Sequence, residues 1–217
     1  MEMKLYHRPD CPFCWKVRIF LQEADIEVAE VTVALGEKHP DIMTLNPNGT
    51  VPVFRDGDLI LWESAVLVEY LADKYPAAAL MAGSPSERAV IRQMHSYSDN
   101  KVGKILFPYI KHVREKGQAS LDKDVRQATE NGWRGIQKIL SEQLADKTFF
   151  GPNFSAADCA LIPRVTLALA YGLSFDDDVE NVKNWYRECV KRPSFSKTLP
   201  ATLPGIDEMI KPEQFDI

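Results

Sequence analysis

Cys11 and Cys14 are the residues of this sequence whose type and spacing point most directly to chemistry. Residues 3–7 alternate as a half-buried strand does, and apolar residues recur at helical spacing between Phe13 and Ala24. Cys11 is therefore expected where a strand ends and a helix begins, with Pro12 suited to the first helical position. Free N–H groups and the positive end of the helix dipole stabilise a thiolate there, so we interpret Cys11 as a nucleophile.

Three other interpretations of the cysteines compete with a reactive thiol. A disulfide between Cys11 and Cys14 closes too short a loop to stabilise the fold much. A zinc site needs a second close pair, whereas Cys159 and Cys189 are far apart in the sequence, so no metal site is expected. The third alternative is a set of inert, packed cysteines. A Cys-x-x-Cys beside a βαβ pattern instead favours a thioredoxin-like redox motif.

Composition and charge limit the class of protein. The chain has 217 residues, of which 45% are hydrophobic and 26% charged, as in ordinary globular proteins. A net charge of −5 argues against a nucleic-acid partner, which usually needs a basic face. No signal peptide and no run long enough to cross a bilayer is found, so no membrane partner is expected. With only four cysteines, the expected location is cytoplasmic, where thiols stay reduced.

The elements expected to position the cysteines follow in the order strand, helix, strand, helix, strand, strand, helix. The second strand is expected at residues 26–33, and the third begins at Thr50, after the dense turn signal of residues 46–49. A hairpin turn at Asp56 and Gly57 leads to the fourth strand, and a helix follows from about residue 64 to 75. This order predicts an α/β thioredoxin-like N-terminal domain over residues 1–76.

Everything after a linker at about residues 76–84 is expected to be helical. Ser84 and Glu87 match a capping box at the start of a long helix, residues 85–115, which Gly103 or Pro108 is expected to kink. Further helices are expected at about 120–145, after Ser155 as a cap, and after residues 176–178. The sequence therefore predicts an all-α C-terminal domain over residues 84–217.

The motifs, in this order and spacing, resemble the glutathione transferase superfamily over nearly the whole chain. The resemblance implies the glutathione transferase fold, glutathione as co-substrate, and a homodimer. The segments that carry it are residues 11–14, 46–53, 61–65, 70–71, 75–76, 155–158 and 192–195.

The resemblance also implies which residues bind glutathione. The proline matching Pro52 is cis in the family, which lets the N–H and C=O of Val51 pair with the tripeptide like an extra strand. Ser64, at a helix start, suits the γ-glutamyl carboxylate, and Glu63 suits the ammonium group. The alternative for Glu63 and Ser64 is plain helix capping.

Lys38 and Cys14 match the family's pattern less closely. In the omega class a lysine for the glycyl carboxylate directly precedes a proline, whereas here His39 precedes Pro40 and Lys38 comes one residue earlier. Lys38 is thus either a ligand or a solvated surface residue. Cys14 makes the motif similar to that of dithiol glutaredoxins, so it either resolves a mixed disulfide on Cys11 or is a packed bystander.

Three functions are compatible with the resemblance, of which a general ligand carrier with a vestigial site is the weakest. The leading one is a cysteine-type transferase, in which the Cys11 thiolate performs glutathione-dependent thiol transfer or reduces a disulfide or dehydroascorbate. Its second substrate, a small electrophile or disulfide, is expected between Cys11 and the first long helix. The alternative comes from residues 45–48 and 61–64, which also resemble the stringent starvation protein A group. Those proteins bind RNA polymerase and regulate transcription without known transferase chemistry, and they generally lack the Cys-Pro-Phe-Cys pair.

Overall fold

Four strands form one mixed sheet in the computed structural model, which describes residues 3–34 and 39–204. They are β1 (Met3–His7), β2 (Ala29–Thr32), β3 (Val53–Asp56) and β4 (Leu59–Trp62), in the order β2-β1-β3-β4 across the sheet. β1 pairs in parallel with β2, and the β1–β3 and β3–β4 pairs are antiparallel. The parallel pair needs a crossover connection, which helix α1 (Pro12–Glu23) supplies.

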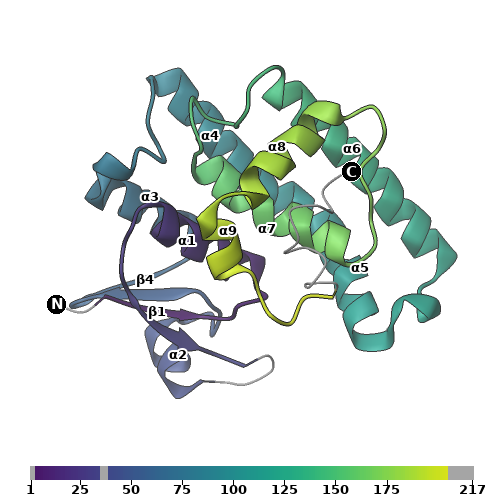
Figure 1. The fold of residues 1–217 in the computed structure, drawn as a ribbon. Helices are drawn as coiled ribbons and strands as arrows, with labels where there is room; N and C mark the ends of the chain where they lie inside the picture. The colour runs from purple at the N-terminus through teal and green to yellow at the C-terminus, as the bar shows by residue number, and fades with distance from the viewer. Residues whose placement is uncertain (1–2, 35–38, 205–217) are drawn as a thin grey trace.

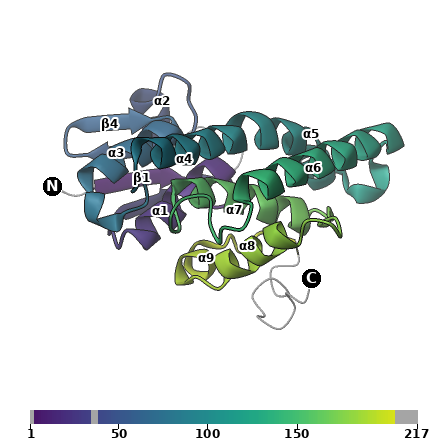
Figure 2. The same cartoon turned by 90° about the horizontal axis from the view of Figure 1, so that it is seen from above.

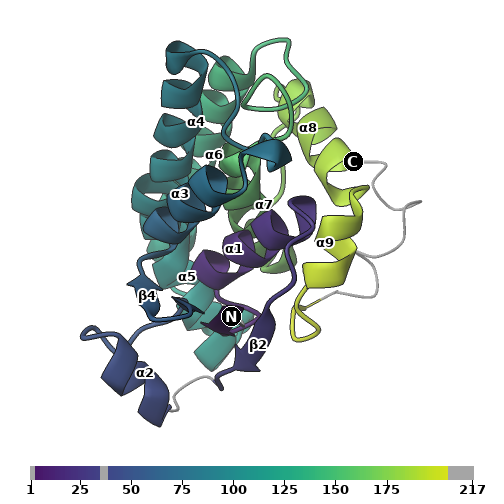
Figure 3. The same ribbon diagram turned by 90° about the vertical axis from the view of Figure 1, so that its left-hand side faces the viewer.

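Helices cover both faces of the sheet. Helix α1 and helix α3 (Ser64–Lys74) lie on one face, and the short helix α2 (Pro40–Leu45) lies on the other (Figures 1 and 3). The predicted thioredoxin-like order of elements is confirmed. Strand β2 is shorter than predicted because the chain is still closing helix α1 at Ile26, whose N–H donates to the carbonyl oxygen of Leu21 at 2.9 Å.

The described residues after Tyr75 are predominantly helical, as the sequence predicts. Helices α5 (Gly103–Lys116) and α6 (Lys123–Leu144) extend away from the sheet, so the helical part of the molecule is elongated (Figure 2). Short helical turns at Pro76–Ala78 and Gln118–Ser120 connect the longer elements. The helices are α4 (Pro85–Tyr97), α5 (Gly103–Lys116), α6 (Lys123–Leu144), α7 (Ala156–Ala170), α8 (Glu180–Val190) and α9 (Pro193–Thr198).

The long helix predicted over residues 85–115 is divided in two. A π-helical turn, Ser98–Val102, separates α4 from α5. Gly103 follows this turn, and a Cβ atom there would lie only 2.9 Å from the guanidinium carbon of Arg164. The glycine therefore permits Arg164 of helix α7 to approach the junction, which is one of the two positions where a kink is expected.

Helix α1 joins the sheet to the helical part of the fold. Trp15 is fully buried in a hydrophobic core that continues into helices α7 and α8. Its indole Nε1 donates a hydrogen bond to Thr198 Oγ1 at 2.9 Å, and Arg192 forms an ion pair of 2.6 Å with Glu23. The helix that begins just after Cys11 is thus held from the sheet side and from the far end of the chain.

Candidate active site

Cys11 lies at the junction that the sequence predicts, directly before the first residue of helix α1. It has extended backbone angles at the N-cap position, and Pro12 takes the first helical position. The pKa of Cys11 is lowered to about 6, most of all by a hydrogen bond from the Cys14 thiol. The backbone N–H groups of Cys14 and Phe13 and the positive charge of Arg8 lower it further, against burial, which raises it. Cys11 is therefore mostly a thiolate at neutral pH.

Cys14 lies one helical turn further along α1 and is fully buried. Burial, followed by the hydrogen bond to Cys11 and the negative charge there, raises the pKa of Cys14 well above its ordinary value. The two cysteines are therefore unequal: one is an anion and the other a neutral thiol that donates to it. The sequence does not predict this, because it attributes the thiolate to the helix N-terminus alone.

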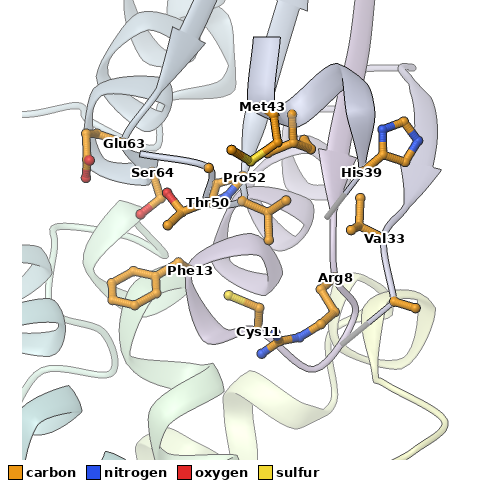
Figure 4. Close-up of a pocket in the computed structure, with 14 residues that line it drawn as sticks. Arg8, Cys11, Phe13, Val33, His39, Met43, Thr50, Pro52, Glu63 and Ser64 are labelled. Carbon is orange, nitrogen blue, oxygen red and sulfur yellow. The ribbon is translucent and has the colours of Figure 1, made fainter. Parts of the chain in front are cut away.

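A pocket of about 390 Å³ opens beside Cys11. Figure 4 shows Cys11 and Phe13 on one side of it, with Glu63, Ser64 and Thr50 opposite them. Five of the residues singled out from the sequence therefore line a single cavity, although they come from three separate segments of the chain. These five are Cys11, Val51, Pro52, Glu63 and Ser64.

The segments that bring these residues to the pocket have distinctive backbone geometry. The Val51–Pro52 bond is cis, as the family resemblance implies. Glu63 is the N-cap of helix α3 and has a positive φ of 72°, a conformation that a residue with a side chain rarely adopts. The Glu63 side chain makes no capping hydrogen bond to the helix, so plain capping does not explain why a glutamate stands at this position. Ser64 is the first residue of α3 and is only 5% exposed, with the helix N-terminus beside the pocket.

The side of the pocket opposite Glu63 is formed by His39 and Arg8 (Figure 4). His39 is the N-cap of helix α2, and its Nδ1 accepts a hydrogen bond from the Asp41 N–H at 3.3 Å. Lys38, predicted as a possible ligand, lies outside the described residues. Arg8 was not singled out from the sequence. A basic residue between a strand and Cys11 could have been recognised there, because its positive charge favours a thiolate.

A second pocket, of about 420 Å³, lies between the start of helix α1 and helix α5. Arg8 lines both pockets, and Pro12 and Phe107 line the second. The position agrees with the expected place of a second substrate, between Cys11 and the first long helix.

A buried polar cluster behind Phe13 is a further feature that the sequence did not reveal. Lys16 Nζ lies 2.6 Å from His95 Nε2 and 2.6 Å from Asp99 Oδ2. Burial lowers the pKa of Lys16, and burial together with the Lys16 charge lowers the pKa of His95 to about 4. His95 had no visible partner in the sequence because Lys16 is 79 positions away.

The remaining candidates are structural. Cys159 and Cys189 are fully buried, and burial raises the pKa of each thiol well above its ordinary value, so they are not nucleophiles. Asp158 accepts hydrogen bonds from the Ser155 N–H and hydroxyl, which completes a capping box at the start of α7, and from the Trp185 indole. Among the residues that the structure describes, no group of three or more potential metal ligands is found, and no helix is long and apolar enough to span a bilayer.

Two protein-family models match this chain, one in each part of the fold. The model of the glutathione S-transferase N-terminal domain matches residues 5–80, which include strands β2 to β4, most of β1, and helices α1 to α3. The model of the glutathione S-transferase C-terminal domain matches residues 98–193. Between them the two models cover both parts of the fold.

Individual relatives extend over most of the chain. Glutathione S-transferase GstB from Escherichia coli strain K12 is 29% identical over 195 residues, 85% of this chain and 91% of that protein. A stringent starvation protein A homolog from Haemophilus influenzae is 27% identical over 203 residues, 93% of this chain and 92% of that protein. The structure of FzlA from C. crescentus superposes with a TM-score of 0.87 at 22% identity and full coverage of both chains, which shows the shared fold. The chain belongs to the glutathione S-transferase superfamily.

Proposed function

We propose that this protein is a cysteine-type glutathione transferase that catalyses thiol–disulfide exchange with glutathione. The observation that carries the proposal is the position of Cys11. Its pKa is lowered to about 6, and it lines the same pocket as Val51, Glu63 and Ser64. Members of the superfamily use glutathione, and the pocket of about 390 Å³ has the size of a small-molecule site.

The pocket suggests one orientation for the tripeptide. The γ-glutamyl carboxylate binds at Ser64 and the N–H groups at the start of α3, and the ammonium group binds Glu63. The cysteinyl backbone pairs with Val51, which brings the glutathione sulfur toward Cys11. The glycyl carboxylate then faces His39 and Arg8, on the side of the pocket opposite Glu63.

The chemistry begins with a mixed disulfide between glutathione and a substrate thiol. The Cys11 thiolate attacks the glutathione sulfur, a Cys11–glutathione bond forms, and the substrate leaves as a thiolate that takes a proton from water. A second glutathione, as its thiolate, then attacks the glutathione sulfur on Cys11. This step releases oxidised glutathione and restores the Cys11 thiolate, so glutathione supplies both electrons.

Cys14 offers a second route for the later step. Its thiol loses its proton and attacks the Cys11 sulfur, which forms a Cys11–Cys14 disulfide and releases glutathione. Two of the causes that raise the pKa of Cys14, the hydrogen bond to Cys11 and the negative charge there, disappear once Cys11 is in a mixed disulfide. Two further glutathione molecules then reduce the Cys11–Cys14 disulfide.

The direct test compares wild type with Cys11→Ser in the reduction of the mixed disulfide between glutathione and 2-mercaptoethanol. Turnover by wild type and its loss in the variant are expected. A Cys189→Ser variant is the matched control, because that thiol is fully buried and does not line the pocket. Equal turnover by wild type and Cys11→Ser would remove the catalytic assignment.

A second candidate function is a protein-binding regulator without transferase activity. The observation that favours it is the relatedness, over more than nine-tenths of this chain, to a stringent starvation protein A homolog and to FtsZ-localized protein A. Glutathione affinity measured by calorimetry and capture of RNA polymerase from lysate distinguish the two functions. Polymerase capture without glutathione binding would favour the regulator.

We also propose that the protein forms a homodimer through strand β4 and helix α3. β4 is an edge strand, and large apolar side chains are exposed on it and on the adjacent helix. Large apolar side chains exposed along an edge strand and its neighbouring helix are typical of a surface that another chain covers. The residues concerned are Leu59, Ile60, Trp62 and Val66.

A further inference from the structure

The second pocket combines apolar walls with an excess of positive charge. Its walls are Pro12 from α1, Leu106, Phe107 and Ile110 from α5, and Leu167 from α7. Phe107 is 63% exposed, which is unusual for a phenylalanine and leaves its ring available at the rim. Apolar walls of this kind suit the hydrocarbon body of a small ligand.

The charges around this pocket do not balance. Four cationic side chains line it, Arg8, Lys111, Arg114 and Arg164, against two acidic ones, Asp10 and Glu115.

Asp10 is shared by two of these cations. It accepts from Arg8 Nε at 2.6 Å and pairs with Arg114 Nη1 at 3.0 Å. Arg8 and Arg114 are thus neutralised in part, and the positive excess rests on the remaining cations.

Arg164 is the member of this set with unused hydrogen-bonding capacity. It is only 6% exposed, and its Nη2 has no hydrogen-bond partner among the described residues. The nearest acidic oxygen, Asp99 Oδ1, lies at 3.8 Å, beyond hydrogen-bond distance, and the other oxygen of Asp99 already accepts from Lys16. A buried donor without a partner costs free energy that a bound acceptor would recover.

The position of Arg164 also links the two pockets. Its guanidinium carbon lies 4.5 Å from the centre of the Phe13 ring, and Phe13 lines the pocket beside Cys11. An anion held at Arg164 is therefore close to the wall that the two pockets share.

We propose that the second substrate is an apolar molecule that carries one carboxylate, with Arg164 as its anchor and Phe107 against its hydrocarbon body. The proposal rests on the proposed function, because it assigns the substrate class to the pocket next to the glutathione site. A carboxylate suits the planar guanidinium, which can donate two parallel hydrogen bonds to it. A neutral analogue of the same shape would keep the apolar contacts and lose this recognition.

The test uses 4-phenylbutyrate and the uncharged 4-phenylbutan-1-ol as probes, with binding measured by calorimetry at pH 7 in the absence of glutathione. Wild type is expected to bind the acid at least tenfold more tightly than the alcohol. Arg164→Met is expected to reduce this ratio below threefold. Arg134→Met is the matched control, because Arg134 is on the exposed surface of α6 and does not line the pocket, so the tenfold ratio should remain.

A Phe107→Ala variant keeps the proposal testable if Arg164→Met does not fold, since the Phe107 side chain is exposed. It should weaken acid and alcohol by a similar factor, about fivefold or more, and leave their ratio unchanged. Equal affinities of wild type for acid and alcohol, an unchanged ratio in folded Arg164→Met, or unchanged binding in Phe107→Ala would each overturn the proposal. Because no glutathione is present, these results are independent of the Cys11→Ser turnover test. If wild type did not prefer the acid but its turnover still depended on Cys11, only the proposed substrate class would be wrong, and the proposed function would stand.

Discussion

Replacing Cys14 by alanine should make Cys11 a much weaker acid. The pKa of Cys11 is lowered from 9.0 to about 6, and the Cys14 thiol is the largest cause. This difference corresponds to about 4 kcal/mol in favour of the thiolate. Cys14→Ala removes the thiol donor but keeps the backbone N–H groups and the charge of Arg8. We therefore expect the pKa to rise by at least one unit, so that the thiolate fraction at pH 7 falls from about 90% to half or less.

The assay is the rate of iodoacetamide alkylation as a function of pH, checked by the thiolate absorbance near 240 nm. Cys11→Ser supplies the background, because Cys159 and Cys189 are fully buried. Cys14→Ser is the matched control, since its hydroxyl still donates a hydrogen bond and should keep the midpoint low. A midpoint that stays near 6 in Cys14→Ala would refute the reasoning and assign the thiolate to the helix N-terminus instead.

Three further predictions concern binding, stability and assembly. Ser64→Ala should weaken glutathione binding about 10- to 100-fold in calorimetry, since a hydrogen bond to a charged group contributes ~1.5–3 kcal/mol. Ser86→Ala, at an exposed position, is the control and should leave the affinity unchanged. Equal glutathione affinities of wild type and Ser64→Ala would exclude a contact between Ser64 and glutathione. Burial lowers the pKa of His95 to about 4, below the ordinary 6.5, so the unfolded chain gains a proton first as the pH falls. From pH 7 to 5 the free energy of unfolding should therefore fall by about 2 kcal/mol more for wild type than for His95→Gln, and parallel curves in urea titrations would contradict this. Trp62→Glu should convert a dimer to a monomer in light scattering, whereas a monomeric wild type would remove the proposed interface.

The order of elements could be predicted from the sequence because it depends on local signals. Alternating and helical periodicity, the turn around Asn48 and the capping box at Ser84 each act within a few residues. The structure has the predicted strands and helices, although β2 is shorter and a π-helical turn divides the long helix. The domain boundary near residues 76–84 stays a prediction.

The residues that line the pocket beside Cys11 could be predicted as a group only from the family resemblance. Composition and periodicity could not place Cys11, Val51 and Ser64 around one pocket, since their positions depend on the arrangement of three segments around the sheet. The roles of Cys11, Cys14, Lys38, Val51, Pro52, Glu63 and Ser64 in catalysis and binding remain predictions.

Features that depend on distant partners could not be predicted at all. From the sequence, Lys16 is expected on the surface of an amphipathic helix. In the structure, His95 of helix α4 and Asp99 of the π-helical turn lie beside its ammonium group and make the burial of Lys16 possible. In the sequence, Arg164 is similarly only a polar residue within an otherwise apolar helix, and no neighbour indicates its partners. Its packing needs Gly103, whose lack of a side chain is informative only once the two helices are seen together.

The bond between Trp15 and Thr198 has a consequence for how the protein is made. The two residues are 183 positions apart, so translation at ~5–20 residues per second separates their synthesis by roughly 10–40 s. During that interval helix α1 lacks α9 as a neighbour, and the Trp15 indole lacks its hydrogen bond to Thr198. The nascent chain thus carries helix α1 without this contact until α9 emerges from the ribosome, and a fragment that stops after the sheet domain would never gain it.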